Sequence, residues 1–423
     1  MSQEKLINDP IHGYMTFKKW AVEFIDTKAF QRLRDIKQLG NCYYIFPGAC
    51  HNRFEHSLGT AHLAYTLAKK LLEQPGIERV NNDLECVTLA ALCHDLGHGP
   101  FSHVFDGDWK HEDGSEKMFD YLYDNMETHS IDLSTDDLKF IKNLIKGDRT
   151  KRSPYLFDIV SNKRNSVDVD KFDYLARDCY YLGMISLFDS PRLMRFSYVT
   201  EDQIVYHHKE CFNIYEMFHT RYTLYKNVYT HRVTRAINFM IRDALVEANP
   251  VYHFENIIKE PEKYIKLNDF ILYKIAPLKK LKEIIEKIRN IKLYKFVNEC
   301  FIPPDKKDKI IKKDLESLIA SYRKEKNPAE HNKFYKKDPN KVFSLDTDGI
   351  CYLFPKQYEE TILRIFARDP EKVDSIQNAF REFTKSIGLS INEGFLPDEN
   401  VDFLDINLKD GSQDDKIKPP NVP

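Results

Sequence analysis

Residues 93–103 hold the side chains whose types and spacing point most directly to chemistry. His94 is followed by Asp95, and His98 and His103 come within the next eight residues. An imidazole nitrogen beside a carboxylate oxygen can bind a divalent cation, and histidines that are not ligands can transfer protons near neutral pH. An isolated His-Asp pair is more often a helix-end histidine beside a surface carboxylate. Seven of the 15 histidines lie between residues 51 and 111, however, so this region is interpreted as the metal centre of a hydrolase.

The elements that must position these side chains are expected to be helices. Residues 86–93 form an apolar helix in this interpretation, and Gly97, Gly99 and Pro100 end it. In an earlier segment, Ser57 or Gly59 is expected to open a helix, with His56 at its start.

Three further polar residues in this region are candidates for the same chemistry. Arg53 lies one turn before His56 and can face an anion bound to the same metal; the alternative is an exposed arginine beside a structural histidine. Asp106 follows His103 by three residues and can hold a proton on a histidine, which raises the pKa of that histidine. His111 is expected to open another helix, and a polar loop is the alternative there.

A second informative block spans residues 168–178. Asp170, Tyr174 and Asp178 are spaced i, i+4, i+8 and share one face of a helix, with Lys171 beside them. Such a row can bind a metal, a phosphate, a ring and a sugar hydroxyl in series. The alternative is an amphipathic helix with a solvated polar face.

A third block, residues 218–232, repeats Arg221, Tyr225 and Tyr229 at intervals of four. One end of this face can bind phosphate, and the other can stack on a base. A packing seam between helices is the alternative.

Composition narrows the class of protein. The chain has 423 residues, 42% hydrophobic and 30% charged, which is typical of a globular protein with a large core. Without an 18-residue apolar run or a signal peptide, neither membrane insertion nor secretion is expected. Eight cysteines without a CxxC pair indicate a reduced intracellular protein, cytoplasmic or nuclear. A net charge of −2 gives no general reason to expect nucleic-acid binding.

The rest of the chain is expected to be mixed. A helix is predicted over residues 23–38, a short hairpin over 198–209, a strand over 350–354 and two helices over 356–387. Residues 279–313 carry 12 Lys/Arg against 5 Asp/Glu, and residues 409–423 are expected to be disordered.

His56, His94, Asp95 and Asp170 together resemble the ligand pattern of HD-domain phosphohydrolases. The similarity extends to the deoxynucleoside triphosphate triphosphohydrolases of the SAM-and-HD-domain type. It is strong over about residues 1–235 and thinner to about 390, and no SAM domain is expected before the catalytic core. The segments that carry it are 8–13, 30–34, 46–49, 52–59, 93–103, 161–178 and 215–221.

The resemblance implies a mainly α fold. An HD-domain helical core with small antiparallel β elements would occupy residues 1–250. A mixed α+β lobe for regulation or oligomerisation would occupy 251–408, followed by the tail 409–423.

The resemblance also implies roles for individual residues. The metal would bind His56, His94, Asp95 and Asp170. His98, His103 and His111 would be catalytic, with His103 the general acid that Asp106 orients. The substrate would contact Arg53, Lys171 and Arg221 through its triphosphate and Tyr174 and Asp178 through its sugar. Leu39 and Tyr229 would crowd the 2′ position, with Gln38 nearby.

At the base end the sequence departs from the family. Tyr225 and Thr230 stand where the family pattern has histidine and glutamine, so the base preference stays open.

Cofactors, activators and oligomers follow from the same resemblance. A divalent metal (Fe, Mn, Zn or Mg) would occupy the HD site, and Mg2+ would accompany the nucleotide. GTP and dNTP activators would drive assembly of a homo-oligomer, dimer to tetramer, although His207 and Lys341 replace family arginines. The residues that match activator sites are Lys5, Asn8, Asp26, Gln31, Arg34, Phe46, Arg192, Lys209, Asn213 and His231.

The expected reaction is hydrolysis of a deoxynucleoside triphosphate to a deoxynucleoside and triphosphate. One alternative is another HD phosphodiesterase, acting on cyclic or guanosine polyphosphate nucleotides. The other is a nucleotide or single-stranded nucleic-acid binder that uses residues 279–313, where stacking aromatic residues are few.

Overall fold

Two buried helices form the centre of the fold, α3 (Arg53–Leu72) and α4 (Asp83–Cys93). Asn52 caps α3, and its backbone N–H donates to Glu55 Oε1. Every residue of α4 from Cys86 to Cys93 is buried, so the His94-Asp95 pair that follows starts from the centre of the molecule. The computed structural model describes residues 4–105, 110–277, 279–306, 318–321, 331–345 and 360–389.

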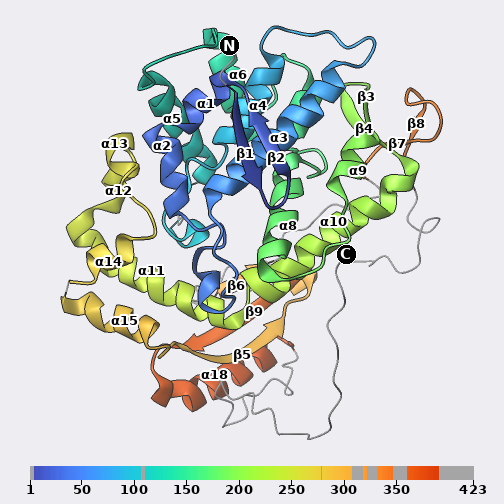
Figure 1. Cartoon of the computed structure of the whole chain (residues 1–423). Coiled ribbons are helices and arrows are strands. Elements are labelled where there is room, and N and C mark those ends of the chain that lie inside the picture. Colours follow the sequence, from blue (N-terminus) through green and yellow to red (C-terminus); the bar gives the residue numbers. More distant parts are fainter. Residues whose placement is uncertain are drawn as a thin grey trace, which may run out of the picture.

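The remaining elements of the first half surround this pair (Figure 1). They are β1 (Lys5–Asp9), β2 (Gly13–Phe17), α1 (Lys19–Ile25), α2 (Lys28–Gln31), η1 (Arg32–Asp35), η2 (Gly40–Tyr44), η3 (Ser102–Val104), α5 (His111–Asp124), α6 (Thr135–Lys146), α7 (Pro154–Val160), α8 (Val169–Leu182) and α9 (Ser190–Arg195).

The second half adds a long helix, α11, and small sheets. Its elements are β3 (Ser197–Thr200), β4 (Gln203–His207), η4 (His208–Glu210), α10 (Cys211–Leu224), the π-helical turn η5 (Tyr225–Tyr229), α11 (Arg232–Tyr252), α12 (Phe254–Ile257), α13 (Pro261–Tyr264), α14 (Ile271–Ile275), α15 (Lys279–Arg289), β5 (Lys295–Phe301), η6 (Pro304–Lys306), β6 (Leu318–Ser321), β7 (Phe334–Tyr335), β8 (Val342–Phe343), β9 (Thr361–Ala367), η8 (Pro370–Lys372) and α18 (Val373–Ser386).

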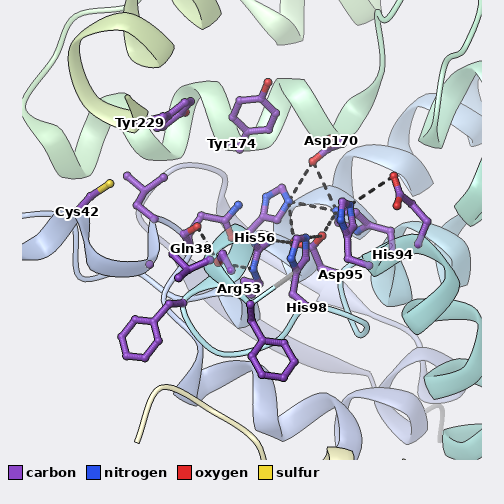
Figure 2. A pocket seen from close by; sticks show the side chains of 18 of the residues that line it. Gln38, Cys42, Arg53, His56, His94, Asp95, His98, Asp170, Tyr174 and Tyr229 are labelled. Atoms are coloured by element: carbon purple, nitrogen blue, oxygen red, sulfur yellow. Dashed lines mark hydrogen bonds and ion pairs between the residues drawn. The ribbon is translucent and has the colours of Figure 1, made fainter. Parts of the chain in front are cut away.

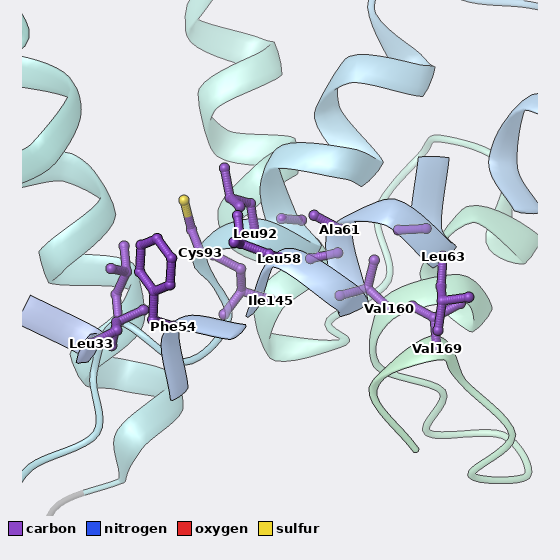
Figure 3. Close-up of a cluster of buried hydrophobic side chains, with 14 of the residues drawn as sticks. Leu33, Phe54, Leu58, Ala61, Leu63, Leu92, Cys93, Ile145, Val160 and Val169 are labelled. Carbon is purple, nitrogen blue, oxygen red and sulfur yellow. The ribbon is translucent and has the colours of Figure 1, made fainter. Parts of the chain in front are cut away.

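The core brings together side chains that are far apart in the sequence. Figure 3 shows Leu58 and Ala61 of α3 beside Leu92 and Cys93 of α4. Gly59 allows the close approach of α8, because a Cβ at this position would lie 1.8 Å from Asp173 Oδ1. The spacing of α3 and α8, each of which carries predicted metal ligands, therefore depends on a residue without a side chain.

The strands in the described part of the chain form three small sheets. β1 and β2 are an antiparallel hairpin, with Asp9 opposite Gly13. β3, β4, β7 and β8 form a second sheet in which β3 and β4 are the predicted hairpin and β4 pairs with β7 in parallel. β5, β9 and β6 form the third, antiparallel sheet, which lies with α18 below α11 in Figure 1. The predicted mainly α fold with small β elements is thus confirmed.

Three local predictions were wrong. Residues 361–367 form strand β9 rather than a helix; β9 is the central strand of its sheet, and its apolar Ile362, Leu363 and Phe366 imitate helical spacing. The helix predicted over 23–38 is split into α1, α2 and η1, because Thr27 caps α2 through its side chain. The helix that carries His56 begins at Arg53 rather than at Ser57 or Gly59.

Two predictions cannot be compared with the structure. The predicted strand 350–354 and the tail 409–423 lie outside the described residues. Among the helices that are described, none combines the length and apolar character needed to span a membrane.

Candidate metal centre and active site

The four predicted metal ligands converge from three helices (Figure 2). His56 lies in the first turn of α3, His94 and Asp95 follow the end of α4, and Asp170 lies in the first turn of α8. His56 Nε2 is 3.2 Å from His94 Nε2 and 3.1 Å from Asp170 Oδ1. Asp95 Oδ1 is 3.4 Å from His94 Nε2. Donor atoms at these separations can surround one cation bound at about 2.0–2.2 Å.

Hydrogen bonds at the far side of each imidazole fix its orientation. His94 Nδ1 lies 2.7 Å from the carbonyl oxygen of Ala91, and His56 Nδ1 lies 2.7 Å from Asp173 Oδ2. When each Nδ1 carries the proton, Nε2 is free to bind a metal. Burial lowers the pKa of His56, but the carboxylates of Asp170 and Asp173 outweigh it and raise this pKa to about 10. The site therefore attracts positive charge strongly.

A buried network of charged side chains contacts His56 on its Nδ1 side, away from the other predicted metal ligands. The sequence did not lead us to predict this network. Asp173 also lies 2.7 Å from His12 Nε2 and accepts hydrogen bonds from Arg177, at 2.8 and 2.9 Å. Arg177 in turn donates to Asp9 at the end of β1, at 2.8 Å. One feature of the sequence could have indicated this network. Asp173 and Arg177 are spaced i and i+4 on the same helix as Asp170, although they lie on the face that packs against other helices.

The predicted phosphate-binding cations line the same cavity, and two of them contact carboxylates. Arg53 donates to Asp95 Oδ2 at 2.5 Å and to Ser102 Oγ at 3.1 Å. Lys171 Nζ is 3.1 Å from both oxygens of Asp168. Arg221 also lines the cavity. Arg53 and Lys171 are therefore held in place by neighbouring carboxylates.

Two of the predicted catalytic histidines lie together beside the metal ligands. The rings of His98 and His111 stack, with centroids 4.1 Å apart, and His98 Nε2 is 3.3 Å from Asp95 Oδ1. Burial, followed by the nearby charge of Arg53, holds the pKa of His98 well below its usual range. The backbone of His103 lies in η3, whereas Asp106 lies outside the described residues.

Farther along the cavity, Asp178 is held by two side chains. Its carboxylate lies 2.7 Å from His51 Nε2 and accepts a hydrogen bond from the Tyr229 hydroxyl at 2.5 Å. Sequence reasoning counted His51 among the clustered histidines but gave it no role. The cavity has a volume of about 1740 Å3. The predicted residues that line it are Gln38, Leu39, Arg53, His56, His94, Asp95, His98, His111, Asp170, Lys171, Tyr174, Asp178, Arg221, Tyr225 and Tyr229.

Comparison with known proteins gives a consistent answer. Residues 53–178 match the HD domain, and residues 188–319 match the HD associated region. The chain is 42% identical to the deoxynucleoside triphosphate triphosphohydrolase SAMHD1 homolog of Dictyostelium discoideum, over 94% of this chain and 84% of that protein. It is 38% identical to the SAMHD1 triphosphohydrolase of Homo sapiens, over 88% of this chain and 71% of that protein.

The chain belongs to the SAMHD1 family. It is also 30% identical to the putative HD domain-containing protein L394 of Acanthamoeba polyphaga mimivirus, over 90% of this chain and 96% of that protein. The HD domain matched at residues 53–178 contains all four predicted metal ligands of this SAMHD1 relative.

The residues that match family activator sites form several groups of contacts. Lys5 binds Asp26 at 2.8 Å, and Arg34 donates to Gln31 at 2.8 Å. Arg192 and Asn213 both contact Glu210, at 2.8 and 3.1 Å. The remaining positions are Asn8 in β1, Lys209 in η4, and Phe46 and His231, whose rings are 5.8 Å apart. Their role in binding activators stays a prediction.

Proposed function

We propose that this protein hydrolyses deoxynucleoside triphosphates to the deoxynucleoside and inorganic triphosphate. The observation that carries the proposal is the convergence of His56, His94, Asp95 and Asp170 at one end of a cavity whose other end is aromatic and polar. The related triphosphohydrolases support the same reaction. Water adds to the α-phosphorus, the bond to the 5′ oxygen breaks, and triphosphate leaves intact.

The four ligands would hold one divalent ion, of Fe, Mn, Zn or Mg. Such an ion offsets phosphate charge and lowers the pKa of water from about 15.7 toward 7. Two imidazoles and two carboxylates suit that group, because the carboxylates of Asp170 and Asp173 favour positive charge at His56.

The cations and histidines of the chain would do the remaining work at the phosphates. Arg53, Lys171 and Arg221 would bind the triphosphate, with Asp95 and Asp168 holding the first two in position. His103 would donate the proton to the leaving 5′ oxygen, with Asp106 orienting it, and His98 and His111 would sit beside the α-phosphate.

The sugar would bind between α8 and η5. Asp178 would accept a hydrogen bond from the 3′ hydroxyl, next to the donors His51 and Tyr229 that already hold this carboxylate. Tyr174 would pack on the ring, and Leu39 and Tyr229 would leave no room for a 2′ hydroxyl. The site would thereby select deoxyribonucleotides.

Regulation and assembly complete the proposal. Mg2+ would accompany the nucleotide, GTP and dNTP would bind at the activator-site residues, and binding would assemble a homo-oligomer, from dimer to tetramer. Residues 1–250 would form the catalytic domain and 251–408 the regulatory lobe. The enzyme would act inside the cell, in the cytoplasm or nucleus.

A product assay tests the reaction. Purified protein with Mn2+ or Mg2+ and each dNTP, with and without GTP, should release deoxynucleoside and triphosphate, resolved by ion-exchange chromatography. Asp170→Ala should abolish turnover, because it removes a metal ligand. The control Asp120→Ala, at a surface residue paired with Lys142, should keep full activity. Release of pyrophosphate or a monophosphate would contradict the proposal and indicate another HD phosphodiesterase.

A further inference from the structure

The cavity does not end at Tyr229 but continues along one face of α11. Thr234, Arg235 and Asn238 line it there, together with Gln38 and Asn41 from the segment 38–41, which includes the start of η2. Asn41 Nδ2 donates to the carbonyl oxygen of Thr234 at 3.1 Å, which ties this segment to α11. These five residues are called the α11 wall below.

Hydrogen-bonding capacity on the α11 wall is unused. Gln38 Oε1, Thr234 Oγ1, Arg235 Nε and Asn238 Oδ1 are buried, and none has a hydrogen-bond partner within the described part of the chain. Buried polar atoms are nearly always paired in folded proteins. Four unpaired atoms on one wall indicate that a polar ligand completes it, after small rotations of these side chains.

The charge on this wall is also uncompensated. Neighbouring Arg364 of β9 is paired with Glu299 at 2.6 Å, whereas Arg235 forms no ion pair with any described residue. The guanidinium carbon of Arg235 lies 5.9 Å from the ring centroid of Phe239. Burial lowers the pKa of Arg235. Tyr225 opposes this shift, and the nearby charge of Arg364 adds to it. Arginine donates only, so its partner must be an electron-rich edge or an anion.

We propose that the α11 wall recognises the base of the substrate and that this base is guanine. The inference rests on the proposed function and specifies its substrate. Guanine offers the adjacent acceptors O6 and N7, the commonest target of arginine, and its N1–H and N2–H2 groups can donate to the amide oxygens of Gln38 and Asn238. Adenine presents an amino donor where guanine has O6, so Arg235 would face a donor there.

The position of the wall fits this assignment. Tyr229, whose hydroxyl contacts Asp178 at the proposed sugar site, lies five residues before Thr234, and Figure 2 shows it on the side of the cavity where Cys42 and Gln38 lie. Tyr225 lines the cavity as well and offers an aromatic face on which a base can stack. The two positions where the sequence departs from the family, Tyr225 and Thr230, thus lie at this same end.

The test compares substrates and side chains together. kcat/KM is measured for all four dNTPs, for 7-deaza-dGTP, which lacks the N7 acceptor, and for dITP, which lacks the 2-amino group. The wild type should prefer dGTP to dATP by about tenfold or more. Arg235→Lys keeps the charge but loses the planar fork, so it should lower the dGTP-to-dATP ratio about tenfold. For the wild type, 7-deaza-dGTP should be a poorer substrate than dGTP. For Arg235→Lys, the two should be equally good substrates.

Controls separate the outcomes. Arg289→Lys, on α15 and outside the cavity lining, should leave the ratio unchanged. Equal use of dGTP and dATP by the wild type, or a preference for dCTP, would overturn guanine recognition while the proposed reaction stands. If Arg235→Lys keeps the full dGTP-to-dATP ratio, the paired contact of the guanidinium with the base is contradicted, and Arg235 acts only through its positive charge. If Arg235→Lys fails to fold, the two analogues still test the base contacts in the wild type. Absence of any dNTP turnover would instead contradict the proposed function.

Discussion

A single carboxylate, Asp173, determines how the metal ligand His56 is oriented. Its oxygens contact four donor atoms, on His12, His56 and Arg177, and its side chain is fully buried. Residues that hydrogen-bond to a ligating histidine fix its tautomer and its ring orientation. Asp173 is thus a positioning residue. The main effect of substituting it should be weaker metal binding.

Asp173→Asn should lower the metal affinity of the protein about 10- to 100-fold, because the amide cannot hold the proton on His56 Nδ1 as a carboxylate does. The measurement is a competition titration of Mn2+ against a chelator, with the thermal melting temperature recorded in parallel. Asp120→Asn, at the surface, is the matched control and should bind Mn2+ as the wild type does. A lower melting temperature with unchanged Mn2+ affinity would reduce Asp173 to a structural role.

At the scale of elements, α8 shows what could be predicted from the sequence. Asp170, Tyr174 and Asp178, whose spacing predicted that they share one face of a helix, all line the cavity. Asp173 and Arg177 were missed, because charged residues on a packing face form a network only with partners from other segments, here Asp9, His12 and His56. Such pairings between distant segments leave no periodic signal in the chain.

Strand β9 was missed for a related reason. As the central strand of its sheet, it is apolar at successive positions, so the alternation that identifies a half-buried strand is absent. The α11 wall gave no signal either, since Arg235 and Asn238 look like ordinary exposed positions of an amphipathic helix until the cavity is known.

Gly59→Ala should destabilise the fold by about 1–3 kcal/mol, because the added methyl group overpacks the contact of α3 with α8. A Cβ there would meet Asp173 Oδ1 at 1.8 Å and Arg177 Nη2 at 2.6 Å. Urea denaturation measures the free energy of unfolding. Lys69→Ala, at an exposed position of the same helix, should change it little. An unchanged free energy of unfolding for Gly59→Ala would mean that α8 can move away from α3 without loss of stability.

At the scale of the whole molecule, residues beyond 250 hold the loops of the active site. Asp269 accepts hydrogen bonds from the backbone N–H groups of Lys37, at 2.9 Å, and Phe101, at 2.7 Å. Tyr264 donates to the carbonyl oxygen of Gly97 at 2.6 Å. The segments that carry Gln38 and His98 are therefore fixed from the second half of the chain.

Asp269 should make stability depend on pH. Burial raises the pKa of its carboxyl to about 6, against about 3.9 in an unfolded chain. The folded state binds this proton more tightly, so the contribution is fully present below about pH 4 and lost as the pH rises through 6. The free energy of unfolding of the wild type relative to Asp269→Asn should fall by about 2–3 kcal/mol from pH 4 to 7. A constant difference would show that the two N–H donors offset burial.

The contact of Arg364 with the carbonyl oxygen of Thr230 links strand β9 to the part of the cavity lined by Tyr225, Tyr229 and Thr230. The predicted metal ligands come from α3, α4 and α8, whereas the α11 wall is built largely from α11 and lies near strand β9, which begins more than a hundred residues after the start of α11. With the base bound at the α11 wall as proposed, substitutions in β9 that displace Arg364 would alter which dNTP is hydrolysed, while the bond that is broken stays the same.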